Sequence, residues 1–160
     1  MKLRSILTLA ITTLLMLSGC APKQDYSYEM HCLGVGAQGT ALLKVYTYAR
    51  NQKRAIEQAK HDAVHGLLFK GLPGGAGCYN QPAIVKPQEL HANEKFFNDF
   101  FRDGEYLRFV TLSTDGNVSA QDRLKVGNRY KIGVAVSVQK DALRKYLEDQ
   151  GVIKSLTSLF

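Results

Sequence analysis

The chain has 160 residues, and its 21 lysines and arginines outnumber its 14 aspartates and glutamates, which gives a formal net charge of +7. The length suits one domain with a single core, and the sequence contains neither an internal repeat nor a low-complexity segment. The basic residues are spread along the chain without a run, which predicts solubility and weak attraction to anionic envelope surfaces and argues against nucleic-acid binding.

The first nineteen residues have the parts of a signal peptide. Lys2 and Arg4 supply positive charge, and residues 6–17 form an apolar run relieved only by threonines. That run is shorter than the roughly 20 apolar residues that span a bilayer. The segment Leu17-Ser18-Gly19-Cys20 follows and resembles the lipobox of bacterial lipoproteins. The sequence therefore predicts removal of residues 1–19 and attachment of diacylglycerol to the Cys20 thiol.

Lipid on Cys20 predicts a membrane anchor for the mature chain. Each buried methylene of fatty acyl chains such as palmitate contributes about 0.8 kcal/mol, so three chains give a permanent attachment. Ala21, and not Asp, follows the cysteine, which by resemblance to lipoprotein sorting rules favours the outer membrane. No acidic cluster follows, so we expect the periplasmic side. Residues 20–30 are then a short polar tether between the lipid and the fold.

The exported chain keeps two more cysteines, Cys32 and Cys78. Disulfides persist outside the cytoplasm, and an even number of cysteines favours pairing. We therefore expect a Cys32–Cys78 bridge, which would stabilise the fold by about 3–4 kcal/mol on the chain-entropy model. Two buried free thiols are the alternative.

The first half of the domain predicts a strand pair and a long helix. Residues 31–35 and 41–48 flank the glycine-rich turn 36–39, and the second segment alternates as a half-buried strand does. Apolar residues at spacings of three and four predict a helix over 49–70, which ends at Gly71 and Pro73. Residues 71–87 are expected to form a long loop that a bridge at Cys78 pins.

The second half predicts a helix over 88–102, a strand over 105–113, a turn over 114–117 and a strand over 129–138. Asp141 is expected to cap a closing helix that runs to Gln150, with Gly151 at its C-terminal end. The helix over 88–102 carries a block of phenylalanines that we expect in the core: Phe96, Phe97, Phe100 and Phe101.

Two motifs raise the question of chemistry. The segment from Gly34 to Gly39 has the spacing of a dinucleotide-binding loop, but a strand-like run follows it, which favours a turn. His61 and His65 lie one helical turn apart, a usable metal-ligand spacing that resembles a shortened zinc-protease motif. Both lie about 140–180° from the apolar stripe of their helix, so we expect them to face solvent. We assign no catalytic residue, metal or cofactor.

The tail, residues 153–160, carries four apolar residues at helix-like spacing: Ile153, Leu156, Leu159 and Phe160. Apolar surface of this kind is buried against its own domain or becomes a contact. We expect it to pack on its own domain. Docking to a partner protein or to a second copy of the chain remains the alternative, and it makes these four the candidate partner-binding residues.

The sequence also resembles a known family. Tyr48-Ala49-Arg50 leads into a helix with Ala55, Ala59 and Ala63, and a Val134-x-Val136-x-Val138 strand precedes Leu143, Leu147, Gly151 and Val152. This pattern, from Leu33 to Val152, resembles the amino-terminal domain of flagellar assembly protein T and related small envelope lipoproteins. The resemblance implies an α+β domain over 31–152, with helices packed on one antiparallel sheet, that acts in assembly and not in catalysis. The cysteine pair, the Pro/Gly-rich loop and the phenylalanine block depart from that pattern.

These features predict an envelope lipoprotein that serves as a structural, assembly or partner-binding component. Its protein partner would meet the loop 71–87 or the tail. One alternative is a small-molecule or peptidoglycan-binding module with a concave site lined by Tyr46, Tyr48 and Tyr79. The lesser alternative is a metal-dependent hydrolase that uses His61 and His65.

Overall fold

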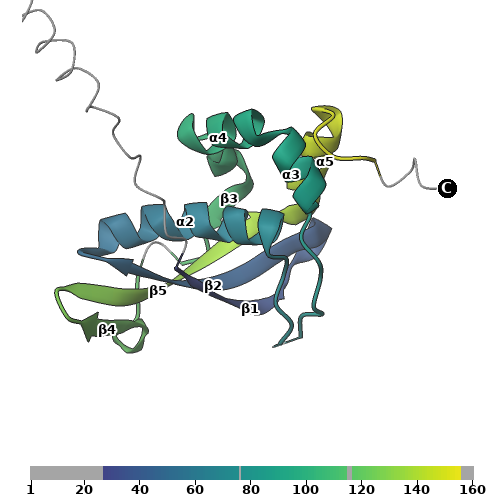
Figure 1. Cartoon of the computed structure of the whole chain (residues 1–160). Helices are drawn as coiled ribbons and strands as arrows, with labels where there is room; N and C mark the ends of the chain where they lie inside the picture. Colours follow the sequence, from purple (N-terminus) through teal and green to yellow (C-terminus); the bar gives the residue numbers. More distant parts are fainter. Residues whose placement is uncertain (1–26, 76, 115–116, 156–160) are drawn as a thin grey trace, which may run out of the picture.

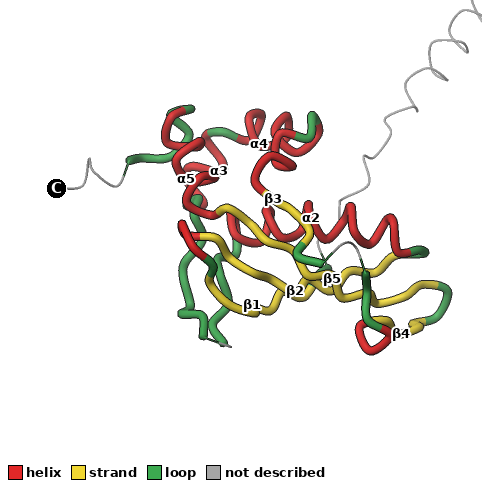
Figure 2. The backbone as a smooth tube through the Cα atoms, turned by 180° about the vertical axis from the view of Figure 1, so that it is seen from behind, coloured by secondary structure: helices red, strands yellow, loops and turns green. Residues whose placement is uncertain are grey.

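The computed structural model describes residues 27–75, 77–114 and 117–155. They form one α+β domain in two layers, with the helices on one face of an antiparallel sheet (Figure 1). The strand order is β1-β2-β5-β3, and β4 pairs with the other end of β5. The reverse view in Figure 2 shows the same two layers. The expected fold class, helices packed on one antiparallel sheet, is confirmed.

The sheet is built on β2 (Thr40–Ala49), which pairs along its whole length with β5 (Arg129–Gln139). Alternate residues of both strands point toward the helices and are fully buried, as Leu43 and Val136 are. The strand β1 (Glu29–Val35) forms the expected hairpin with β2. Its glycine-rich connection is the short 3-10 turn η1 (Ala37–Gly39), not a nucleotide-binding loop that opens a helix.

The helix α2 (Gln52–Phe69) crosses the sheet. It begins three residues later than expected because β2 continues to Ala49, and the Asn51 side chain caps it by accepting a hydrogen bond from the Arg54 backbone N–H at 3.0 Å. It ends at Phe69 with Lys70 as the C-cap, after which Gly71 adopts a φ of +90°. Small residues allow the close approach to the sheet, and three of them have no exposed surface: Ala55, Ala59 and Ala63.

The helix expected over 88–102 is two helices, α3 (Pro87–Ala92) and α4 (Glu94–Arg102). The break lies at Asn93, whose side-chain amide donates to the Glu89 carbonyl at 2.9 Å and to the Val152 carbonyl at 3.4 Å. The phenylalanine block belongs to the core as expected, since Phe97 and Phe100 are each only 3% exposed and the other two pack against them.

The segment expected to be a strand over 105–113 is mostly the 3-10 helix η2 (Glu105–Phe109), and only β3 (Val110–Leu112) pairs with β5. A further 3-10 turn, η3 (Ala120–Asp122), precedes β4 (Arg123–Val126), a strand that the sequence pattern did not indicate. All four residues of β4 are exposed, so they show no alternation between buried and exposed positions.

The closing helix α5 (Lys140–Asp149) ends as expected, because Gly151 has a φ of +69° and its N–H bonds to the Glu148 carbonyl. The cap was wrong: Gln139 is the N-cap, and Asp141 lies inside the first turn. Ile153 is only 6% exposed and packs in the core, so it is not a free docking residue. The other tail candidates, Leu156, Leu159 and Phe160, lie outside the described residues.

The expected disulfide is confirmed: Cys32 on β1 is bonded to Cys78 in the loop after α2, and their Cα atoms are 6.2 Å apart. It pins that loop to the edge of the sheet, and two backbone hydrogen bonds, from Ile84 to Leu67 and from Val85 to Leu68, hold its far end. Cys20 and the signal segment lie outside the described residues. Among the residues that are described, no helix combines the length and the apolar character needed to cross a bilayer.

Candidate functional site

The two histidines of α2 lie in an aromatic cluster and do not face solvent. The His61 ring is 4.6 Å from the Phe101 ring and 5.6 Å from the Tyr106 ring, and it stacks on His65 at 6.0 Å. The expectation of solvent-facing histidines was wrong because α4 and η2 pack on a second side of α2. That helix is therefore covered both by the sheet and by the other helices.

Protein groups already contact one ring nitrogen of each histidine. Nδ1 of His65 lies 2.9 Å from the Tyr28 hydroxyl, and Nδ1 of His61 lies 3.2 Å from the carboxylate of Asp62. That carboxylate is 2% exposed and also accepts a hydrogen bond from Gln58 at 2.7 Å. In the described part of the chain, no group of three or more His, Cys, Asp or Glu side chains is placed to hold a metal ion. The metal-dependent hydrolase considered as an alternative would use His61 and His65 as ligands. Among the described residues, no third ligand lies beside them.

Burial decides the charge of His65. Removal of the imidazole from water, followed by the charges of His61 and Lys70, lowers the pKa of His65 from 6.5 to about 4, while Asp62 acts in the opposite direction. His65 is therefore neutral at pH 7. His65 therefore contributes an aromatic ring with a hydrogen-bonding edge to the cluster, and not a positive charge.

An open pocket of about 600 Å³ lies beside this cluster, between α2 on one side and α3 and α4 on the other. We call it the α2–α4 pocket. Its apolar lining comes from Phe69, Pro87, Leu90, Phe97 and Phe101. Four polar side chains complete the lining: His65, His91, Glu94 and Asn98. Predominantly apolar walls with a few polar groups, at this volume, are typical of a binding site.

The sequence reasoning missed most of the pocket. Leu90, Glu94, Phe97 and Phe101 follow one another at spacings of three and four, so the stripe was visible in the sequence. That spacing indicates which residues share a side of a helix. It does not indicate whether that side is covered completely by its neighbours or left partly open.

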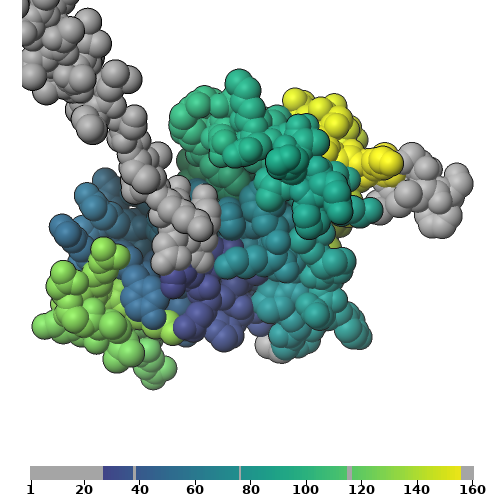
Figure 3. All heavy atoms as spheres, viewed as in Figure 1, coloured from purple at the N-terminus to yellow at the C-terminus, as the bar shows by residue number. Residues whose placement is uncertain are grey.

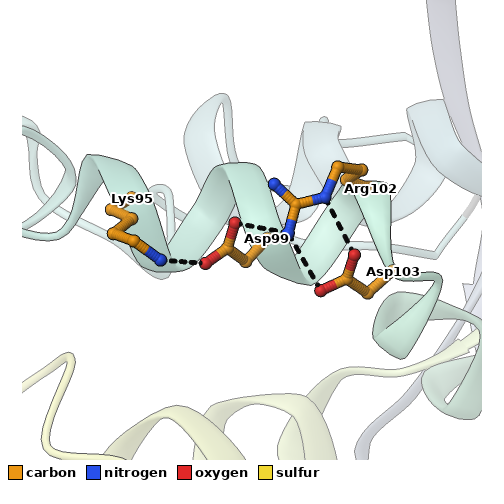
Figure 4. Close-up of polar contacts among 4 residues, drawn as sticks. All are labelled: Lys95, Asp99, Arg102 and Asp103. Atoms are coloured by element: carbon orange, nitrogen blue, oxygen red, sulfur yellow. Dashed lines mark hydrogen bonds and ion pairs between the residues drawn. The ribbon is translucent and has the colours of Figure 1, made fainter.

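The opposite side of α4 is charged. Figure 4 shows a ladder in which Lys95 contacts Asp99 at 2.6 Å, Arg102 contacts Asp99 at 2.8 Å, and Arg102 contacts Asp103 at 2.9 Å. Hydrogen bonding to Lys95 lowers the pKa of Asp99. Exposed pairs of this kind contribute little to stability. The ladder gives α4 a charge-balanced solvent side and leaves its aromatic side for the core and the pocket.

The face of the sheet that the helices leave open carries a second polar network. The Tyr46 ring lies across Gly133, where an added Cβ would sit 2.6 Å from the ring. Its hydroxyl donates to Asp122 at 3.1 Å, and Lys44 also donates to that carboxylate at 2.8 Å. Burial and this hydrogen bond raise the pKa of Tyr46. Tyr46 is therefore part of the sheet's own packing.

The three tyrosines of the alternative binding site do not come together. Tyr46 and Tyr48 project from the open face of β2, whereas Tyr79 lies in the disulfide-pinned loop and is 85% exposed. A side chain with that exposure does not line a concave site. Comparison of the chain with family models, with curated proteins and with solved structures found no match.

Proposed function

We propose that this chain is a lipid-anchored envelope lipoprotein whose domain acts as an assembly or partner-binding component and not as an enzyme. Lipid on Cys20 would hold the domain at the periplasmic side of the outer membrane. An apolar segment of a partner protein would then occupy the α2–α4 pocket. The observation that carries the binding role is the pocket itself, about 600 Å³ of open, aromatic-walled space.

The disulfide supports the export part of the proposal. Both sulfur-bearing residues are buried, Cys32 at 4% and Cys78 at 8% exposure, and the bond connects two segments 46 residues apart. Bridges of this structural kind persist in oxidising compartments and are rare in the cytosol. The signal segment and Cys20 supply the sequence side of the same proposal.

The chemistry of the pocket supports a protein partner. Phe69 and Phe101 are only partly buried, so the fold leaves aromatic surface available. Buried aromatic contacts dominate the binding energy of protein interfaces, and polar groups at the edge fix the orientation of the partner. Asn98 and His91 are exposed on the pocket and can supply such hydrogen bonds.

The experiments can also identify two other functions, binding of a small apolar ligand and metal-dependent hydrolysis. A small apolar ligand is the second candidate, because the volume of the pocket falls within the range of small-molecule sites. The hydrolase that would use His61 and His65 predicts stoichiometric zinc in the purified protein. Protein purified without chelators and free of zinc at neutral pH would remove that alternative.

Photo-crosslinking in cells tests the proposal. A photoreactive benzoylphenylalanine at His91, on the pocket, should give one discrete product larger than the chain by the mass of one partner. The same probe at Gln121, an exposed residue of η3, is the control. Asn98→Trp, designed to fill the pocket, should abolish the product, and Gln150→Trp at the exposed C-cap of α5 should not.

The crosslinking outcomes separate the occupants. A product of twice the chain's mass would show a second copy in the pocket, and a small added mass would show a small ligand. Equal products from His91 and Gln121, or a His91 product that survives Asn98→Trp, would contradict a protein partner in this pocket.

A further inference from the structure

One end of the domain gathers exposed cations. We call it the basic end, and it comprises Arg50, Lys53, Arg54, Arg123, Lys125 and Arg129. All six side chains are exposed, and none forms a salt bridge with another described residue. Figure 3 shows the first turns of α2 and the hairpin of β4 and β5 together at this end, and Figures 1 and 2 agree.

The register of the sheet brings these residues together. Ala49 at the end of β2 pairs with Tyr130 at the start of β5, so Arg50 continues past the sheet beside Arg129. Tyr130 also pairs with Lys125 of β4. The helix α2 begins two residues after Arg50, which leaves its first turn at the same end. Charges that are more than 70 residues apart in the sequence therefore gather at one end of the domain.

Among the described residues, the acids next to the basic end are largely paired with other cations. Asp122 is paired with Lys44 at 2.8 Å, and Glu29 is paired with Lys131 at 2.7 Å. Glu57 lies beside Arg54 on α2 and offsets one of the six charges. The surface therefore keeps a net positive charge.

The stability of the fold accounts for one of these cations, Arg123, whose guanidinium lies 4.3 Å from the centroid of the Tyr130 ring, but not for those of α2. The first turn of α2 contains no acidic residue, and Lys53 and Arg54 lie there. Cations near a helix N-terminus are unfavourable because the helix dipole is positive at that end. An anionic partner would relieve this repulsion, whereas water and salt only screen it.

The basic end also exposes aliphatic side chains. On β4, Leu124 is 62% exposed and Val126 is 44% exposed. They pair with Lys131 and Arg129 of β5 and share a face of the hairpin with those two cations, whereas Arg123 and Lys125 project from the other face of this edge strand. Cations mixed with exposed aliphatic residues suit the boundary between lipid headgroups and acyl chains. An acidic protein would use the charges but would leave these aliphatic side chains without an apolar counterpart.

The start of β1, where the tether from Cys20 joins the domain, lies close to the basic end. β1 begins at Glu29 opposite Tyr46, three residues before β2 ends at Ala49. Cys20 lies eight residues before Tyr28, a reach of at most about 28 Å for extended chain. A tether of that length allows the basic end to touch the bilayer that holds the lipid.

We propose that the basic end binds the anionic headgroups of a phospholipid surface, with Leu124 and Val126 entering the interface. This goes beyond the lipid anchor, since it gives the folded domain its own membrane contact and one preferred orientation. The contact does not require the acyl chains on Cys20, so it can be tested without them.

The test uses the mature-length chain with Cys20→Ser, mixed with phosphatidylcholine vesicles or with vesicles that also contain phosphatidylglycerol. We expect sedimentation with the anionic vesicles only, and weaker binding as salt rises. A triple variant, Arg123→Gln with Lys125→Gln and Arg129→Gln, should bind on the order of 100-fold more weakly, because each cation near an anionic surface contributes about fivefold. The matched control removes three cations elsewhere, at Lys95, Lys145 and Lys154, and should bind within about twofold of the parent.

Thermal melting of each variant verifies that it is folded. Equal losses in both triple variants would overturn the proposal, because they would show an effect of net charge alone. Failure of the folded parent to bind anionic vesicles would also overturn it. So would binding to a polyglutamate peptide but not to vesicles, which would identify an acidic protein instead. None of these results bears on the partner of the α2–α4 pocket, which the crosslinking tests separately.

Discussion

Removal of the disulfide should destabilise the domain strongly. Cys32 and Cys78 are 46 residues apart, and closing a loop of that size removes about 4 kcal/mol of chain entropy from the unfolded state at 25 °C. Replacement of both residues by alanine leaves small apolar side chains in buried positions, so no unpaired polar group is introduced. We therefore expect a loss of about 4 kcal/mol in the free energy of unfolding.

Urea denaturation and thermal melting of the parent and of the alanine variants measure this loss. For a domain of this size, 1 kcal/mol corresponds to about 3–5 °C, so the midpoint should fall by about 12–20 °C. The single variants Cys32→Ala and Cys78→Ala should each lose nearly as much as the double variant, because any one of them opens the same loop.

Two results would refute this reasoning. One is a double variant that melts within about 3 °C of the parent, which would mean that the loop closure carries little stability. The other is unreduced protein in which both thiols alkylate freely, since mass spectrometry should instead recover the peptides of Cys32 and Cys78 joined.

Three further predictions follow from single positions. Phe100→Ala should cost about 3–5 kcal/mol in urea denaturation, because the side chain is 3% exposed within the aromatic core, and a melting change within error would place the phenylalanine block on the surface. Because the pKa of His65 is lower in the folded state than in the unfolded state, the free energy of unfolding should fall as the pH drops from 6.5 toward 4. After allowance for solvent screening, we expect a loss of about 1–2 kcal/mol. Equal pH dependence in the parent and in a His65→Gln variant would contradict this. Gly133→Ala should displace the Tyr46 ring, since the new Cβ would meet it, and an unchanged Tyr46 ring spectrum by NMR would argue against that contact.

Local patterns predicted the elements that depend on neighbours in sequence. The alternation of β2 and β5, the apolar stripe of α2 and the glycine after α5 each depend on residues within one element. The expectation of helices packed on one antiparallel sheet, which is the fold class observed, came from the resemblance and did not extend to the strand order. The pairing of Cys32 with Cys78 was predicted from the expected export of the chain and from the even number of cysteines that remain after Cys20.

The errors share one physical cause, which is contact between distant segments. The break at Asn93 is supported by a hydrogen bond to Val152, 59 residues away, and no local pattern reports that partner. His61 and His65 appeared to face solvent because α4 covers their side of α2 only in the folded domain. Ile153, by contrast, packs into the core as the preferred reading of the tail expected.

The basic end shows the same limit for function. Arg50 and Arg129 become neighbours only through the register of β2 with β5. In the sequence they are far apart, so the basic residues seem evenly spread along the chain. Every residue of β4 is exposed, so that strand lacks the periodic signal of a half-buried strand. Surfaces assembled from several segments are therefore the part of the site that sequence patterns predict least.

Mass spectrometry of the N-terminal peptide of the protein isolated from membranes tests whether Cys20 carries the lipid anchor. We expect a peptide that begins at Cys20 and carries the mass of diacylglycerol with its acyl chains, and we expect Cys20→Ser protein to leave the membrane fraction. An unmodified N-terminus at any other residue, together with Cys20→Ser protein that fractionates as the parent does, would contradict it.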